Sequence, residues 1–193
     1  MGQNKKTYVF SDEHLMRRFQ NGDENAYETL VSRYKDKLHN FIYFFVGDKD
    51  LAEDLVQDTM VRLFTKKHYY KEVAKFSTWI YTIARNLSNS ELRKRKNRKT
   101  FTISELSKDK SSYDLKDEKP GIEQSLELKY DLEQIKIMIN KLSKPFRTVI
   151  ILRDIESLSY VDISKIEGVP VGTIKSRINR ARLQLRRELK DLF

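Results

Sequence analysis

The residues of this sequence best suited to chemistry are basic and polar side chains near its C-terminus. Between Gly172 and Arg187 there are six basic residues and no acidic residue. Arginine can read guanine and asparagine can read adenine in the major groove of DNA, while other cations meet phosphates. Helical spacing places the candidates on or beside one outward face: Lys175, Ser176, Arg177, Asn179, Arg180, Arg182 and Arg186. The segment predicts a DNA-contacting helix rather than an ordinary solvated basic helix.

The residues before this segment complete a helix-turn-helix pattern. Ser159 and Asp162 have the spacing of a capping box at a helix start. Gly168-Val169-Pro170 forms a tight turn, after which apolar residues recur at helical spacing. Two short helices separated by a glycine-containing turn are typical of this motif.

A second candidate is an acidic helix face formed by Asp50, Glu53, Asp54 and Asp58. Three of these carboxylates repeat every four residues, so a helix places them on one side. Because no histidine accompanies them, the pattern favours a solvated or docking face over a metal site. No cofactor is predicted, and no set of residues suited to nucleophilic or acid–base catalysis predicts an enzyme.

A third candidate interleaves aromatic rings with cations: Tyr69, Tyr70, Lys71, Lys75, Phe76, Trp79 and Tyr81. Such a pattern suits stacking with unpaired bases. On residue type alone, however, Trp79 is better explained as a core side chain. Six basic residues follow among the seven from Arg93 to Lys99, which indicates a solvated helix end or a phosphate contact.

Four helices must position the second and third candidates. Ser11, Asp23, Asp48 and Ser77 are suited to cap their starts. Residues 66–75 interrupt the apolar period and predict a loop. Residues 104–121 contain only two large aliphatic side chains and end in Lys-Pro-Gly, which predicts a flexible linker.

Apolar residues return at helical spacing after this linker: Ile122, Leu126, Leu132, Ile135, Ile139 and Leu142. Ser143-Lys144-Pro145 then suits a cap and first turn. The sequence therefore predicts an all-α fold of two small helical domains. Their expected extents are residues 11–97 and 122–193, with the linker at 98–121.

Composition excludes several classes of protein. The chain has 193 residues, a net charge of +10 and no cysteine, which favours a polyanionic partner and excludes disulfides and thiol chemistry. The longest apolar run, residues 41–46, is far shorter than the ~20 residues of a membrane span. We expect a cytoplasmic protein that does not insert into membranes.

Three segments in order resemble bacterial extracytoplasmic-function (ECF) sigma factors. Residues 50–59, DLAEDLVQDT, are similar to the second conserved region of that family. Residues 76–86, FSTWIYTIARN, resemble its promoter-melting segment, and residues 170–182, PVGTIKSRINRAR, resemble the helix-turn-helix of its fourth region. The resemblance covers about residues 11–97 and 122–193.

This resemblance implies an alternative sigma factor that brings core RNA polymerase to promoters and is not an enzyme. The implied partners are promoter DNA, the beta-prime clamp and beta flap of the polymerase, and an anti-sigma factor. The residues implied for polymerase binding are Asp54, Gln57, Asp58, Arg62 and Phe64, with Leu63 as a further apolar contact. Those implied for the minus-ten element are Tyr69, Tyr70, Lys75, Ser77 and Asn86. Those implied for the minus-thirty-five element are Lys175, Ser176, Arg177, Asn179 and Arg180.

The main alternative is a stand-alone helix-turn-helix regulator with an N-terminal effector or dimerisation domain. It explains the C-terminal motif equally well, but it leaves the acidic face and the melting-like segment unexplained. A third alternative, an RNA-binding or structural helical adaptor, would explain only the net positive charge of the chain.

Overall fold

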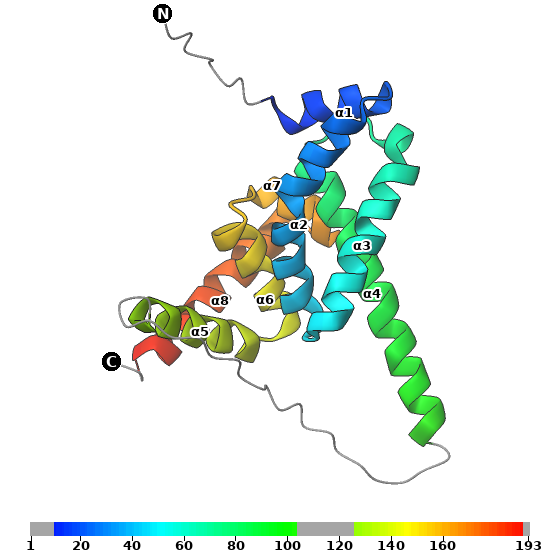
Figure 1. Ribbon diagram of the computed structural model, residues 1–193. Coiled ribbons are helices and arrows are strands. Elements are labelled where there is room, and N and C mark those ends of the chain that lie inside the picture. The colour runs from blue at the N-terminus through cyan, green and yellow to red at the C-terminus, as the bar shows by residue number, and fades with distance from the viewer. Residues whose placement is uncertain (1–9, 104–125, 191–193) are drawn as a thin grey trace, which may run out of the picture.

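The computed structural model describes residues 10–103 and 126–190, and within these ranges it contains helices and no strand (Figure 1). The expectation of an all-α fold with two helical domains is confirmed. None of the helices in these ranges is long and apolar enough to cross a membrane. The residues expected to form most of the linker, 104–121, lie outside the described ranges.

The N-terminal domain is built from four helices and one short 3-10 turn. They are α1 (Asp12–Gln20), α2 (Glu24–Val46), α3 (Lys49–Thr65), η1 (Lys67–Tyr69) and α4 (Phe76–Ile103). The Ser11, Asp23 and Asp48 side chains accept backbone N–H bonds at the starts of α1, α2 and α3, as predicted. Gly47 ends α2 with φ 76°, a left-handed conformation that glycine adopts without steric cost.

The core of this domain lies where the apolar stripes of α1 to α4 meet. Met16, Leu30, Leu38 and Phe76 are fully or almost fully buried. The Phe76 and Tyr81 rings of α4 pack edge-on against rings of α2. This packing fixes which side of α4 faces inward and which side remains available.

The C-terminal domain contains α5 (Leu126–Lys141), α6 (Lys144–Ile150), the π-helical turn η2 (Ile151–Ile155), α7 (Tyr160–Glu167) and α8 (Val171–Lys190). Ser159 caps α7 through the Asp162 N–H, and Gly168 ends α7 with φ 66°, which confirms the predicted helix-turn-helix pattern. Ile174, Ile178 and Ala181 of α8 are buried against the domain core.

Several local expectations are wrong. Helix α4 begins at Phe76, so Ser77 lies inside its first turn and does not precede it as a cap. Helix α4 also continues to Ile103, six residues into the segment expected to be linker. Ile135 of α5 is 44% exposed, and Met138 is buried on the core side instead. The sequence pattern did not reveal η2, because a π turn follows α6 without a break in hydrophobicity.

The two domains pack directly against each other. Helix α4 lies against α7, and α2 contacts α6, so a single hydrophobic cluster extends through both domains. Helix α3 packs on α2 and α4, on the side away from α8 (Figure 1). The surface of α3 is therefore separate from the contact between the domains.

Candidate docking and nucleic-acid surfaces

Helix α3 presents an exposed polar face flanked by an aromatic ring. Its four polar residues of interest are all exposed: Asp54, Gln57, Asp58 and Arg62. Phe64 is 44% exposed, and its ring contacts the rings of Phe19 and Tyr27, which hold it in place. Leu63, in contrast, is 1% exposed and belongs to the core, so the expectation that it contacts a partner is wrong.

The two tyrosines of the loop after α3 have different environments. Tyr69 is 73% exposed, whereas Tyr70 is 4% exposed. The Tyr70 ring packs near Phe76 and Trp79, and its hydroxyl donates to the Ala74 carbonyl over 2.8 Å. Burial, reinforced by nearby Glu13, raises the pKa of Tyr70 to about 12. Tyr70 thus packs beneath the loop as part of the core, and only Tyr69 has an exposed ring, with the Lys66 ammonium 5.1 Å from its centroid.

A carboxylate from a distant part of the sequence caps the start of α4. Glu13 of α1 accepts the Phe76 N–H over 3.1 Å. The Gln20 side chain of α1 donates to the carbonyls of Lys67 and Tyr70, over 2.7 and 3.0 Å. Helix α1 therefore holds both the aromatic loop and the first turn of α4 in fixed positions.

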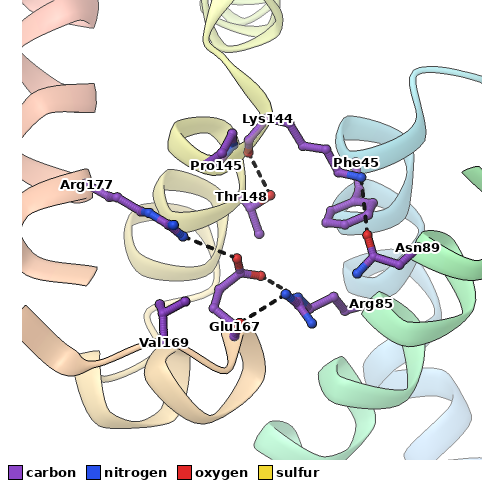
Figure 2. A pocket seen from close by; sticks show the side chains of 9 residues that line it. All are labelled: Phe45, Arg85, Asn89, Lys144, Pro145, Thr148, Glu167, Val169 and Arg177. Atoms are coloured by element: carbon purple, nitrogen blue, oxygen red, sulfur yellow. Dashed lines mark hydrogen bonds and ion pairs between the residues drawn. The ribbon is translucent and has the colours of Figure 1, made fainter. Parts of the chain in front are cut away.

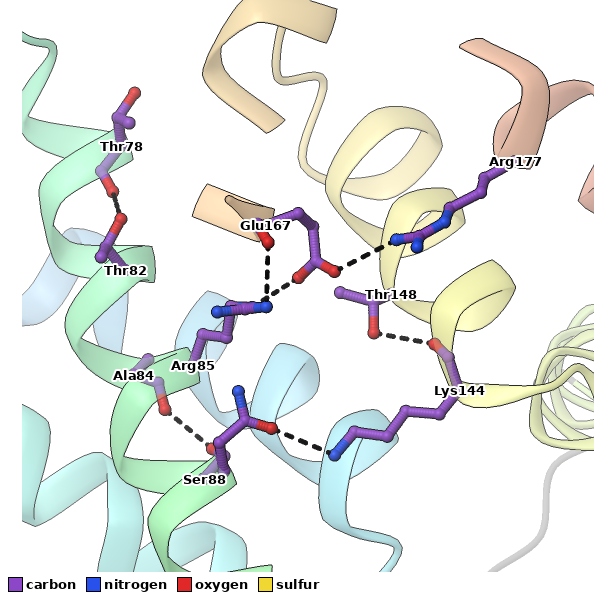
Figure 3. A network of polar contacts seen from close by, with 10 residues as sticks. Thr78, Thr82, Ala84, Arg85, Ser88, Lys144, Thr148, Glu167 and Arg177 are labelled. Atoms are coloured by element: carbon purple, nitrogen blue, oxygen red, sulfur yellow. Dashed lines mark hydrogen bonds and ion pairs between the residues drawn. The ribbon is translucent and has the colours of Figure 1, made fainter. Parts of the chain in front are cut away.

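Of the residues expected to meet the minus-ten element, Lys75 precedes α4 and donates to Asp162 of α7, whereas Ser77 and Asn86 lie on α4. The Lys75 side chain is 64% exposed, Ser77 is half-buried and Asn86 is exposed. Beside them runs a second polar stripe, Thr78, Thr82, Arg85 and Asn89, at steps of four, three and four. Thr78, Arg85 and Asn89 of this stripe bond to residues of the C-terminal domain, and Figure 3 shows Arg85 reaching Glu167, whereas Thr82 donates to the Thr78 carbonyl within α4.

Helix α8 keeps four of its five predicted DNA-contacting residues exposed: Lys175, Ser176, Asn179 and Arg180. The fifth, Arg177, is half-buried and points toward Glu167 at the end of α7, with 3.8 Å between Nη1 and Oε2 (Figure 2). Arg182, one turn further along, pairs with Asp154. The outward face of α8 therefore remains open at its N-terminal half.

Glu167 lies at the centre of a polar layer between the domains (Figures 2 and 3). Arg85 of α4 donates to its carboxylate over 2.7 Å and to its backbone carbonyl over 3.0 Å. An open pocket of about 280 Å³ adjoins it, lined by these two residues and by Arg177, Lys144 and Asn89 among others.

Lys144 and Asp162 complete this layer. Lys144 lies 3.8 Å from the Phe45 ring centroid and donates to Asn89, and burial lowers its pKa. Asp162 accepts bonds from Lys75 and Thr78 over 3.1 and 3.0 Å. Burial raises the pKa of the Asp162 carboxyl, but hydrogen bonds from Ser159, Lys75 and Thr78 outweigh that effect and leave the pKa below its usual value.

Sequence reasoning missed Glu13, Thr78, Arg85 and Glu167 as parts of these surfaces. Glu13 contacts Phe76 over 63 positions of the chain, Thr78 contacts Asp162 over 84, and Arg85 contacts Glu167 over 82, so no local spacing signals these contacts. The i, i+7 spacing of Thr78 and Arg85 was a usable signal, since it puts them on one side of α4. In the described ranges, no group of three or more histidine, aspartate or glutamate side chains could hold a metal ion.

Comparison with protein families gives two matches along the chain. Residues 30–98 match the model described as sigma-70 region 2, and residues 132–185 match the model described as sigma-70, region 4. Together these segments cover more than half of the sequence.

Characterised relatives are similar over nearly their whole length. The chain is 35% identical over 190 residues to the ECF RNA polymerase sigma factor SigW of Bacillus subtilis, covering 89% of this chain and 92% of that protein. It is 32% identical over 186 residues to the ECF RNA polymerase sigma-E factor of Haemophilus influenzae, with coverage of 95% and 97%.

Solved structures agree with this similarity. The sigma factor RpoE of Bartonella quintana, solved with the anti-sigma factor NepR, is 32% identical with a TM-score of 0.67, covering 84% of this chain and 96% of that one. CnrH, solved with the cytosolic domain of CnrY, has the same TM-score at 20% identity over 94% and 99% of the two chains, and supports the fold alone.

Proposed function

Because this chain belongs to the ECF family of RNA polymerase sigma factors, we propose that α3 docks on core polymerase while α4 and α8 contact promoter DNA. The chain is an alternative sigma factor that directs promoter-specific initiation of transcription. What remains to be assigned is which of its residues carry out each part of this task.

The exposed face of α3 is the observation that carries the docking assignment. Asp54, Gln57, Asp58 and Arg62 are exposed, and no ion pair within the described ranges involves either aspartate. Free carboxylates on a rigid helix suit a basic partner surface, and they guide association as well as binding. Phe64 adds an apolar contact at the end of this face. We assign this surface to the beta-prime clamp of core polymerase.

The minus-ten element is assigned to the aromatic loop and the start of α4. Tyr69 offers a stacking face, while Lys75, Ser77 and Asn86 offer charge and hydrogen bonds. Flipping a base out of the duplex costs a few kcal/mol, which contacts with the protein must offset. Because α1 already holds the loop in place, little further free energy is lost in ordering the loop when DNA binds. Tyr70 is proposed to support this loop rather than to touch DNA.

The minus-thirty-five element is assigned to the N-terminal half of α8. Lys175, Ser176, Asn179 and Arg180 are exposed there, and Arg177 becomes available if its partner Glu167 moves away. We propose that the beta flap of core polymerase contacts the apolar and basic surface of the C-terminal domain outside this DNA-contacting half of α8. Neither domain is proposed to have catalytic activity, and the chain is proposed to work in the cytoplasm, where its polymerase partner acts.

We also propose an anti-sigma factor as a partner. The RpoE structure, similar to this chain at 32% identity and a TM-score of 0.67, was solved with such a protein. A protein that holds the two domains together would keep α4 and α8 from reaching their promoter elements at the same time. We propose residues 11–97 and 122–193 as the units that would separate, with α4 continuing as a helix beyond the first unit to Ile103.

The docking assignment is tested by reversing two charges on α3. The full-length Asp54→Lys/Asp58→Lys variant should lose core polymerase in a pull-down and should fail in run-off transcription. The matched control is Glu28→Lys/Asp36→Lys, which reverses two exposed carboxylates on α2.

Two results would contradict this assignment. One is normal core binding by a folded Asp54/Asp58 variant, which would remove α3 as the docking surface. The other is equal loss of binding in the Glu28/Asp36 control, which would mean that net charge alone governs the association.

A further inference from the structure

We propose that the pocket between the two domains binds a small diphosphate, that is, two linked phosphate groups carried by inorganic pyrophosphate or by a nucleoside diphosphate. This inference goes beyond promoter recognition and does not depend on it, because it gives the chain a small-molecule ligand. Both domains line the pocket: α2 and α4 contribute Phe45, Arg85 and Asn89, and α6, α7 and α8 contribute Lys144, Glu167 and Arg177 among others (Figure 2).

Positive charge exceeds negative charge in this pocket. Its lining includes the three cations Arg85, Lys144 and Arg177, and Glu167 is the only carboxylate among the described residues that line it. Arg85 Nε donates to Glu167 Oε1 over 2.7 Å, whereas Arg177 Nη1 lies 3.8 Å from Oε2. One carboxylate balances one of the three positive charges, so two remain. An anion that carries two or more charges would balance them.

The Lys144 ammonium contacts two neutral groups in the pocket. It lies 3.8 Å from the centroid of the Phe45 ring and donates to Asn89 Oδ1 over 3.4 Å, which is a long hydrogen bond. Burial lowers the pKa of Lys144 despite the opposing effect of Glu167, and nearby arginines lower it further. The charge of this side chain is therefore poorly compensated within the chain, and a bound phosphate would compensate it.

The two arginines have donors to spare for a ligand. Arg85 uses Nε and one terminal nitrogen for the carboxylate and the backbone carbonyl of Glu167. At 3.8 Å, Arg177 and Glu167 attract each other without forming a hydrogen bond. A guanidinium has five N–H donors in a planar fork that matches phosphate oxygens in pairs. Each of these arginines can therefore accommodate a further acceptor.

The donors lie in two groups around the pocket. Lys144 and the Asn89 amide form one group, and Arg85 and Arg177 form the other beside Glu167 (Figure 2). Because Asn89 Oδ1 accepts from Lys144, its Nδ2 is left to donate to a ligand. Two linked phosphates offer one anionic group to each set of donors.

The size and polarity of the pocket also indicate a compact, charged ligand. Its volume is about 280 Å³, slightly below the ~300–1,000 Å³ of typical small-molecule sites, which are lined mostly by apolar side chains. Here charged and polar side chains contribute much of the lining instead. Because the pocket is open to solvent, a nucleoside carried on the diphosphate can extend out of it.

The test measures anion binding to the full-length chain by isothermal titration calorimetry. Sodium pyrophosphate, orthophosphate and ADP are titrated in magnesium-free buffer at constant ionic strength, because exposed charges are screened by salt. The pocket variants are Lys144→Met, which keeps an apolar stem against Phe45, and Arg177→Gln. The matched controls are Lys141→Met and Arg180→Gln, which remove exposed cations of the C-terminal domain outside the pocket.

We expect wild type and both controls to bind pyrophosphate with similar affinity. Lys144→Met and Arg177→Gln should each raise Kd about tenfold or more, since each loses a hydrogen bond between charged groups. Orthophosphate reaches only one donor group and should bind at least tenfold more weakly than pyrophosphate. Tighter binding of pyrophosphate than of ADP would assign the site to the free inorganic ligand, and the reverse order would assign it to a nucleoside diphosphate.

Thermal unfolding provides a second measurement. A ligand that binds only the folded chain raises the melting temperature, by about 5–10 °C for a chain of this size at a concentration of about 100 times Kd. Melting without ligand shows whether each variant is folded. If Lys144→Met does not fold, Arg177→Gln, on a different helix, still tests the site.

Several results would overturn the inference. One is the absence of binding of pyrophosphate and ADP to wild type at millimolar concentration, and another is unchanged affinity in folded Lys144→Met and Arg177→Gln. Equal weakening in Lys141→Met would mean that net charge governs binding, and loss of binding in Arg180→Gln would place the anion on the outward face of α8. These measurements involve neither core polymerase nor promoter DNA, so their failure leaves the proposed function standing.

Discussion

Arg147 joins the two domains through backbone carbonyls, and its replacement should destabilise the chain markedly. Its guanidinium donates to the Phe44 carbonyl in the last turn of α2 over 3.0 Å. It also donates to the carbonyls of Asn140 and Leu142, at the end of α5, over 2.9 and 3.1 Å. One cation thus serves the C-terminal ends of two helices from different domains, where helix dipoles favour positive charge.

The expected magnitude follows from these contacts. A hydrogen bond to a charged group contributes about 1.5–3 kcal/mol, and partial access to water lowers the sum of the three. We expect Arg147→Met to reduce the free energy of unfolding by about 3 kcal/mol. For a chain of this size each kcal/mol changes the melting temperature by about 2–4 °C, so the loss should be about 6–12 °C.

The assay is thermal unfolding followed by circular dichroism at pH 7. Arg147→Lys is the informative second variant, because a single ammonium cannot span carbonyls of both helices as the planar guanidinium does. We expect it to recover less than half of the loss. Arg93→Met, an exposed position on α4, serves as the control. A melting temperature for Arg147→Met within 2 °C of wild type would refute the reasoning, as would full recovery by lysine.

Three further predictions concern stability and DNA recognition. Asp162→Asn should lower the melting temperature at pH 7, and the difference from wild type should shrink as the pH falls below 4. The reason is that a carboxyl with a lowered pKa in the folded chain stabilises above its unfolded pKa of about 3.9, and that contribution disappears on protonation. Glu13→Ala should cost about 1 kcal/mol in chemical denaturation, because the start of α4 loses its cap. Asn179→Ala or Arg180→Ala should lose ~1–3 kcal/mol of preference at single base pairs in a minus-thirty-five promoter library, whereas Arg186→Ala should leave the preferred sequence unchanged.

Each of these predictions has a result that would contradict it. A pH-independent difference for Asp162→Asn would mean that its charge is not what stabilises the contact. Unchanged stability of Glu13→Ala would mean that water caps α4 as well as the carboxylate does. If Arg186→Ala changes the base preference while Asn179→Ala and Arg180→Ala do not, the C-terminal half of α8 contacts the bases, and our assignment of the N-terminal half to the groove is wrong.

The sequence alone was sufficient for features that depend on neighbouring residues. Helix caps at Ser11, Asp23, Asp48 and Ser159 were predicted correctly, because a cap bonds to a backbone N–H three residues away. The helix-turn-helix followed from the same kind of local signal. The exposure of the acidic face of α3 followed from the helical spacing of its apolar residues, since a helix that buries an apolar stripe must expose the opposite side.

Local pattern failed where chemically similar residues have different neighbours in space. Tyr69 and Tyr70 are adjacent and identical, yet one is exposed and the other is covered by Phe76 and Trp79. Ser77 looked like a cap, but Glu13 from α1 provides one a residue earlier. Such choices are made by packing between elements, which spacing along one helix does not encode.

The contact between the domains was decided by the tertiary structure alone. The sequence predicted two helical units joined by a polar linker and indicated no contact between them. In the folded chain Asp162 and Glu167 meet Lys75, Thr78 and Arg85 across more than 80 positions. A charged side chain on a helix surface looks the same in sequence whether water, DNA or another helix neutralises it. Only the three-dimensional arrangement shows that here the partner is the chain itself.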